Sequence, residues 1–155
     1  MDLHKKVPNF TLKTDEEKTV SLADYAGKPV VLFFYPRANT PGCTIEACGF
    51  RDAFKKLQAA GVVVLGISRD TPRAQAKFRA KYNLPYTLLA DDEEAVCKLF
   101  DVLKEKNMYG KKVWGIVRST FVIGPDRTLL HVFANVKPEG HAEEVLALIE
   151  EWKRE

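Results

Sequence analysis

The sequence predicts an α/β fold in which helices flank a central mixed β-sheet. Two observations carry this prediction: apolar runs alternate with helical patterns, and a hairpin followed by an amphipathic helix ends the chain. Val30–Tyr35 and Val62–Ile67 are continuous apolar runs, and Thr87–Ala90 is a weaker third. Short runs of this kind are typical of strands that are buried on both faces of a sheet.

Helical patterns separate these strands. The first extends from about Cys43 to Ala60. The second opens at Thr71-Pro72, because threonine is a good capping residue and proline is favoured in the first turn of a helix. A short helix is expected around Glu93–Phe100. Strands that alternate with helices in this way form βαβ units.

The last part of the chain adds an antiparallel pair and a helix. Thr120–Ile123 and Thr128–Phe133 bracket Gly-Pro-Asp-Arg, which is typical of a β-hairpin. The final helix has an apolar stripe made of Ala142, Val145, Leu146, Leu148, Ile149 and Trp152. A βαβ unit followed by a hairpin and a final helix is the order of a thioredoxin-like sheet. A short N-terminal hairpin, Phe10–Leu12 with Thr19–Leu22, is expected to precede it.

Length and composition limit the function classes. A chain of 155 residues suits one domain, expected to span residues 1–155. The net charge of +3 is spread among 21 acidic residues, so no nucleic-acid partner is expected. The N-terminus lacks the apolar core of a signal peptide, and no apolar run reaches membrane-spanning length, so no membrane partner is expected either. Three cysteines form no disulfide framework, which favours a reducing, cytoplasmic location.

Cys43 is the strongest candidate for a reactive residue. Helical geometry of about 100° per residue places it on the core-facing side of its helix, together with Ala47, Phe50, Phe54 and Leu57. Cys48 lies about 140° around the helix, away from that side. Cys43 falls in the first turn, just after a buried strand, where free backbone N–H groups and the helix dipole favour a thiolate.

Structural explanations compete with this one. A cysteine on an apolar face is usually a small core residue, and this is the preferred interpretation of Cys97, although a resolving role for it stays open. Two cysteines separated by four residues are weak evidence for zinc, which needs four ligands. His4, His131 and His141 follow no metal-ligand spacing, so each is expected to be a surface or structural residue and no metal is expected.

The residues around Cys43 resemble a known family. Pro36-Arg-Ala-Asn-Thr40-Pro-Gly-Cys43 fits the P-x-x-x-T-x-x-C signature of peroxiredoxins. The longer segment from Thr40 to Asp52 is similar to the peroxiredoxin Q branch, also called bacterioferritin comigratory protein. The resemblance covers nearly the whole chain, since it includes Val7–Leu12, Gly115–Phe121 and Val136–His141.

This resemblance implies a thiol peroxidase that reduces hydrogen peroxide and organic hydroperoxides without a metal or a bound organic cofactor. Cys43 would be the peroxidatic nucleophile, Thr40 and Arg118 would contact thiolate and peroxide, and Pro36 would shield the pocket from water. Cys48 would be the resolving cysteine, in a Cys43–Cys48 disulfide that thioredoxin or a similar dithiol donor reduces. The chain lacks the Gly-Gly-Leu-Gly loop and C-terminal Tyr-Phe of oxidation-sensitive dimeric peroxiredoxins, so a monomer or weak homodimer is expected.

The spacing of the two cysteines adds a conformational expectation. Residues five apart on an ideal helix have Cα atoms about 8.6 Å apart, whereas a disulfide tolerates at most about 7 Å. The first turn or two must therefore unwind before Cys43 and Cys48 can bond, and Gly42 and Gly49 should lower the cost of opening.

Two other function classes stay open, a thioredoxin-fold disulfide reductase and a copper-binding module of this fold. The first would carry C-x-x-C at the start of the helix. The second resembles C-x-x-x-C with a distant histidine. Neither spacing is present.

Overall fold

The computed structural model describes residues 1–155, except for the side chain of Met108. The main sheet has the strand order β2–β1–β5–β4–β3–β8–β9. Its strands are β1 (Thr11–Thr14), β2 (Thr19–Ser21), β3 (Val30–Phe34), β4 (Val63–Ser68), β5 (Thr87–Ala90), β8 (Ser119–Ile123) and β9 (Leu129–Phe133). The helices are α1 (Pro41–Ala59), α2 (Pro72–Tyr82), α3 (Ala95–Leu99) and α4 (His141–Arg154), with a 3₁₀ turn η1 (Leu22–Tyr25).

The sheet is mixed, as the sequence predicts. Strand β3 pairs in parallel with β4, and β4 with β5. The pairs β3–β8, β8–β9, β1–β5 and β1–β2 are antiparallel. Every predicted strand and helix is present, and their ends shift by a few residues. In the described chain no helix is both long enough and apolar enough to cross a membrane.

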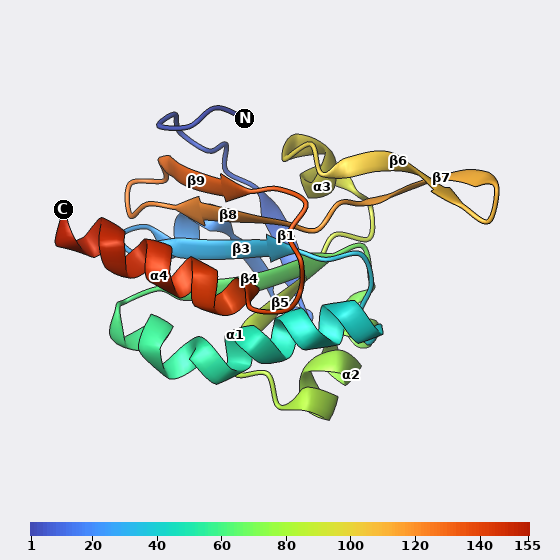
Figure 1. Cartoon of the computed structure of the whole chain (residues 1–155), viewed down its shortest axis with the longest axis horizontal. Coiled ribbons are helices and arrows are strands. Elements are labelled where there is room, and N and C mark those ends of the chain that lie inside the picture. Colours follow the sequence, from blue (N-terminus) through green and yellow to red (C-terminus); the bar gives the residue numbers. More distant parts are fainter.

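Two cores lie on opposite faces of the sheet because side chains alternate along each strand. Val31 and Phe33 of β3 point into the core under α1, α2 and α4. Their neighbours Val30, Leu32 and Phe34 point into the core covered by the N-terminal segment, η1 and α3. Figure 1 shows α1 and α4 side by side across one face of the sheet. The central strand is therefore buried on both faces, which explains its uninterrupted apolar run.

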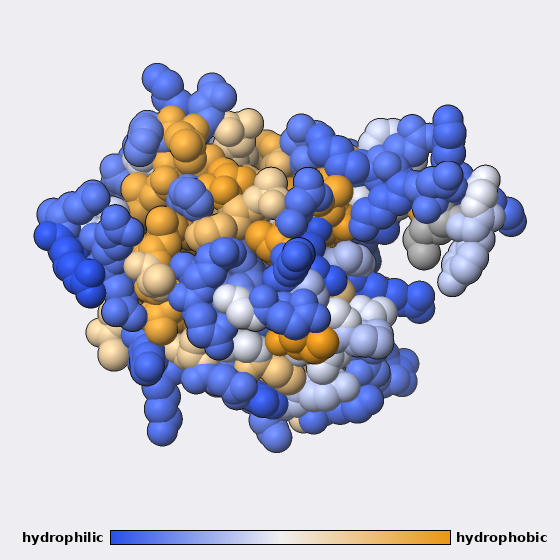
Figure 2. All heavy atoms as spheres, in the orientation of Figure 1, coloured by the Kyte–Doolittle hydropathy of each residue, from blue (hydrophilic) through white to orange (hydrophobic). Residues whose placement is uncertain are grey.

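One element was not predicted. Strands β6 (Leu103–Met108) and β7 (Lys111–Ile116) form a separate two-stranded sheet, an arm that projects from the body (Figure 1). Tyr109 and Gly110 have φ values of 54° and 79°, which suits a two-residue hairpin turn. Figure 2 shows that hydrophilic residues cover most of the arm. Because lysines interrupt the hydrophobic alternation, the arm gives only a weak strand signal in the sequence.

Cys97 is a core residue, as preferred from the sequence. It has no exposed surface, and its backbone N–H donates a hydrogen bond to the Asp91 carboxylate at 2.6 Å. Burial raises the pKa of the Cys97 thiol well above its ordinary value, and the neighbouring Asp91 raises it further. The thiol therefore stays protonated, which disfavours a resolving role in this folded state.

Candidate active site

Strand pairing brings two distant parts of the chain to one edge of the sheet. Phe34, the last residue of β3, lies opposite Ser119, the first residue of β8. The loop that follows β3 and the residue that precedes β8, Arg118, therefore meet at this edge. Helix α1 starts from the same loop, with Thr40 as its N-cap residue in an extended conformation.

Cys43 and Arg118 come together here although they are 75 residues apart. The Cys43 side chain lies in the first turn of α1 and is 1% exposed. Nη1 of Arg118 lies 3.5 Å from its Sγ atom, close enough for a hydrogen bond to sulfur. The Arg118 side chain is 15% exposed, so water screens its charge only weakly. A permanent cation thus faces a buried thiol at a helix N-terminus.

Glu46 is a third member of the site, and sequence reasoning gave it no role. Its Oε1 atom accepts a hydrogen bond from Arg118 Nη1 at 2.8 Å, and its side chain has no exposed surface. Among the described groups, its Oε2 atom has no hydrogen-bond partner. Burial raises the pKa of Glu46 to about 7, against the opposing effect of Arg118. The sequence signal that could have indicated Glu46 was its spacing, because a residue three positions after Cys43 lies on the same side of the helix.

Two glycines permit close approaches around Cys43. A Cβ atom on Gly42 would lie 3.0 Å from Nη2 of Arg118 and 3.6 Å from Cγ of Pro138. The bare backbone therefore gives the guanidinium room to reach the first turn of α1. A Cβ atom on Gly49 would lie 3.4 Å from that of Ala142, where α1 packs on α4. Both glycines have a packing role, and their effect on helix opening stays a prediction.

The loop that carries Pro36 and Thr40 is held by its own hydrogen bonds. The Thr40 hydroxyl donates to the carbonyl oxygen of Arg37 at 2.8 Å. The N–H of Ala38 donates to the Asp70 carboxylate at 2.8 Å. Pro36 is half-buried at the end of β3. The structure thus places both predicted residues in the loop before Cys43, with the hydroxyl proton of Thr40 directed to the loop itself.

Cys48 lies one turn further along α1 and is partly exposed. Cys43, Cys48 and Cys97 are all free thiols in this structure. Helix α1 runs without interruption through both Cys43 and Cys48, so their Cα atoms are held about 8.6 Å apart. The hydroxyl of Tyr86 donates to the carbonyl oxygen of Ala47, at 2.6 Å, and fixes the helix between the two cysteines. This conformation does not allow the pair to bond.

Comparison with known proteins shows the family of this chain. The model of the AhpC/TSA family matches residues 3–132. The chain belongs to the AhpC/TSA family. Peroxiredoxin Bcp of Bacillus subtilis is 42% identical over 151 residues, which cover 97% of this chain and 96% of the relative. Peroxiredoxin Bcp of Escherichia coli is 43% identical over 144 residues, covering 93% and 92%.

Solved structures give the same assignment. PrxQ of Xylella fastidiosa superposes with a TM-score of 0.94 at 36% identity, covering 99% of this chain and 98% of that one. Bacterioferritin comigratory protein of Xanthomonas campestris superposes with a TM-score of 0.87 at 40% identity, covering 91% and 90%. The predicted thioredoxin-like fold and the predicted peroxiredoxin Q branch are confirmed, so this peroxiredoxin is an oxidoreductase.

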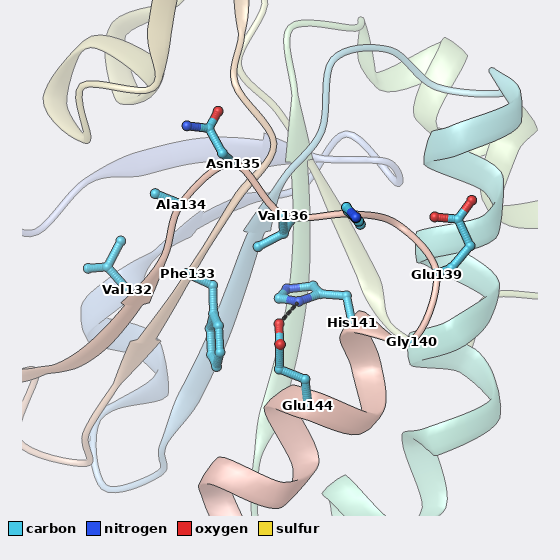
Figure 3. A pocket seen from close by; sticks show the side chains of 10 residues that line it. Val132, Phe133, Ala134, Asn135, Val136, Glu139, Gly140, His141 and Glu144 are labelled. Atoms are coloured by element: carbon cyan, nitrogen blue, oxygen red, sulfur yellow. Dashed lines mark hydrogen bonds and ion pairs between the residues drawn. The ribbon is translucent and has the colours of Figure 1, made fainter.

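A surface pocket of this peroxiredoxin lies between the end of β9 and the start of α4. Its volume is about 470 Å³, and Figure 3 shows the ring of His141 at its centre, near Phe133. The His141 Nε2 atom lies 2.7 Å from the Thr120 hydroxyl, and Nδ1 lies 2.9 Å from the Glu144 carboxylate. Burial lowers the pKa of His141. His141 is therefore a structural histidine, as expected from the sequence.

The described side chains form no cluster of metal ligands. No group of three or more His, Cys, Asp or Glu residues there could hold a metal ion. The copper-binding alternative thus has no candidate ligand set among them. Cys97 cannot share a ligand set with Cys43, because the two residues belong to the cores on opposite faces of the sheet.

Proposed function

We propose that Cys43 reduces hydrogen peroxide and organic hydroperoxides as the peroxidatic nucleophile. The observation that carries this proposal is the Arg118 guanidinium, 3.5 Å from a buried thiol in the first turn of a helix. The Cys43 thiolate attacks the terminal peroxide oxygen, so that an S–O bond forms while the O–O bond breaks. Cys43 becomes a sulfenic acid, and the departing oxygen takes up a proton and leaves as water or an alcohol.

The neighbouring groups match the charge that develops in this step. Negative charge builds up on the departing oxygen, and positioned donors lower the barrier for such a step. In our proposal Arg118 supplies a fixed cation, the backbone N–H of Cys43 is a further donor, and Pro36 limits access of water. The Thr40 hydroxyl donates to the Arg37 carbonyl in this conformation, so it has to rotate before it can donate to the peroxide. The Xanthomonas campestris relative, described in terms of alkyl peroxide reduction, supports organic hydroperoxides as substrates.

Cys48 completes the cycle in this proposal. Its thiol condenses with the sulfenic acid of Cys43 to form a disulfide and release water, and a dithiol reductant of the thioredoxin kind then restores both thiols. The continuous helix α1 supports a conformational step between oxidation and condensation. We also propose that residues 1–155 act as one cytoplasmic domain, as a monomer or weak homodimer.

Cysteine variants test these assignments. Cys43→Ser should abolish peroxide consumption with dithiothreitol or thioredoxin as reductant, because serine supplies no comparable nucleophile. Cys48→Ser should lose most thioredoxin-supported turnover, while Cys97→Ser keeps it. Initial rates of peroxide loss measure all three. Full thioredoxin-supported activity in Cys48→Ser would disprove the resolving role, and turnover independent of Cys43 would disprove the proposed function.

Helix opening has its own test. Oxidation by one equivalent of peroxide should form the Cys43–Cys48 disulfide and unwind the first turns of α1, since the intact helix holds the two Cα atoms too far apart. Hydrogen exchange should then accelerate at the backbone amides of residues 44–49 and stay slow in α4. Reduced protein and oxidised Cys48→Ser serve as controls. An oxidised protein whose α1 amides remain as protected as in the reduced form would contradict the mechanism.

A further inference from the structure

Lys106 lies in the middle of β6, and its side chain reaches back to the base of the β6–β7 arm. Its Nζ atom donates a hydrogen bond to the carbonyl oxygen of Ile116 at 2.6 Å, and the side chain is only partly exposed. The side chain of Lys106 lies over Gly115. A Cβ atom on Gly115 would come within 3.3 to 3.4 Å of Cδ, Cε and Nζ of Lys106. Gly115 therefore leaves the space that Lys106 fills, three residues before Arg118.

The carbonyl group that anchors this ammonium belongs to Ile116, two residues before Arg118, the residue that touches Cys43. Burial lowers the pKa of Lys106, the positive charges of Arg118 and Arg69 lower it further, and Cys43 raises it. Both arginines have carboxylate partners: Arg118 binds Glu46 at 2.8 Å, and Arg69 binds Glu94 at 2.9 Å.

Lys106 differs from these arginines and from two other lysines of the arm. Lys104 pairs with Asp101 at 3.1 Å, and Lys112 pairs with Glu105 at 3.8 Å. Among the side chains that the structure describes, no carboxylate lies within ion-pair distance of Lys106. A half-buried ammonium beside a cationic site, without an acidic partner of its own, is suited to an anionic ligand.

We propose that Lys106 forms a subsite for the carboxylate of organic hydroperoxides that carry one, next to the Cys43–Arg118 site. The proposal rests on the proposed peroxidase function. An ammonium group has three N–H donors. One is used by Ile116, so two remain for carboxylate oxygens while the hydroperoxide group enters the site beside Arg118. Figure 1 shows the arm projecting from the same end of the molecule at which α1 begins, the helix that carries Cys43 in its first turn.

A matched pair of substrates tests the subsite. Cumene hydroperoxide and its para-carboxylate derivative differ by one anionic group, and dithiothreitol serves as the reductant for both. In the native protein, kcat/KM should be higher for the carboxylate. Lys106→Met should lower kcat/KM for the carboxylate by about tenfold, the size of one charge-assisted hydrogen bond, and leave cumene hydroperoxide unchanged. Lys106→Arg should keep the preference, and Lys111→Met, at an exposed position near the tip of the arm, should not alter it.

The other outcomes are distinguishable. Equal losses for both substrates in Lys106→Met would mean that Lys106 acts on Cys43 rather than on the substrate, and would overturn the subsite. Unchanged rates for both would overturn it as well, as would a native protein without preference for the carboxylate. If the native protein reduced neither compound nor hydrogen peroxide, the proposed function itself would fail. Unchanged cumene hydroperoxide turnover also shows that Lys106→Met has folded.

Discussion

Arg118→Met lowers the second-order rate constant for hydrogen peroxide by about 10² to 10³-fold, the loss seen when one positioned charge-stabilising donor is removed. Arg118 is the cation that touches Sγ of Cys43, at 3.5 Å, and it is largely shielded from water. Arg118→Lys should recover part of the rate, because it keeps the charge but not the planar two-pronged geometry. Stopped-flow measurement of peroxide loss gives the constants.

The control must separate chemistry from folding. Removing Arg118 leaves the buried carboxyl of Glu46 without its cation, and an uncompensated buried charge is strongly destabilising. The double variant Arg118→Met/Glu46→Gln removes this penalty, so it should regain stability without regaining rate. A double variant with nearly native rate constants would show that Arg118 serves the fold and not the reaction.

Glu46→Gln should remove a pH dependence of stability. The carboxyl of Glu46 has its pKa raised from 4.5 to about 7 by burial, so the folded state binds its proton more tightly than the unfolded state. Stability contributed by the protonated group is present below pH 4.5 and is lost as the pH rises to about 7. At about 1.4 kcal/mol per pH unit, the native protein loses roughly 3 kcal/mol of unfolding free energy across this window.

Urea unfolding between pH 4 and 8 measures this difference. The gap between Glu46→Gln and the native protein should widen across that window in favour of the variant, whereas Glu150→Gln, at an exposed position on α4, should follow the native protein. His141 contributes with the opposite sign, because burial lowers its pKa and stability is lost as the pH falls. It is present in all three proteins and cancels in the comparison. Parallel pH curves for Glu46→Gln and the native protein would contradict the assignment.

Much of the fold could be predicted from local patterns. Val30–Phe34 is apolar at every position because both faces of its strand are buried, and Thr71-Pro72 carries the start signals of a helix. The β6–β7 arm was not predicted, because the prediction depended on local hydrophobic patterns, which are weak in the arm. A projecting hairpin has little core to face, so lysines and a glutamate replace the alternating pattern that marks a half-buried strand.

The sequence by itself predicted the chemical type of the site: a cysteine in the first turn of a helix after a buried strand, in a segment that resembles peroxiredoxins and includes Thr40 and Cys48. Helical periodicity also placed Cys43 toward the core and Cys48 away from it. These features depend on residues near each other in the chain, and local geometry is enough to relate them.

Only the tertiary structure decided how the charges meet. The antiparallel register of β3 and β8 brings Arg118 to Cys43, and burial turns Glu46 from one acidic residue among many into a carboxyl with a pKa of about 7. The side chain of Lys106 takes up its position, and with it the proposed subsite, because Gly115 leaves room for it. Contacts over such sequence distances, and the desolvation that shifts a pKa, exist only when the sheet is assembled.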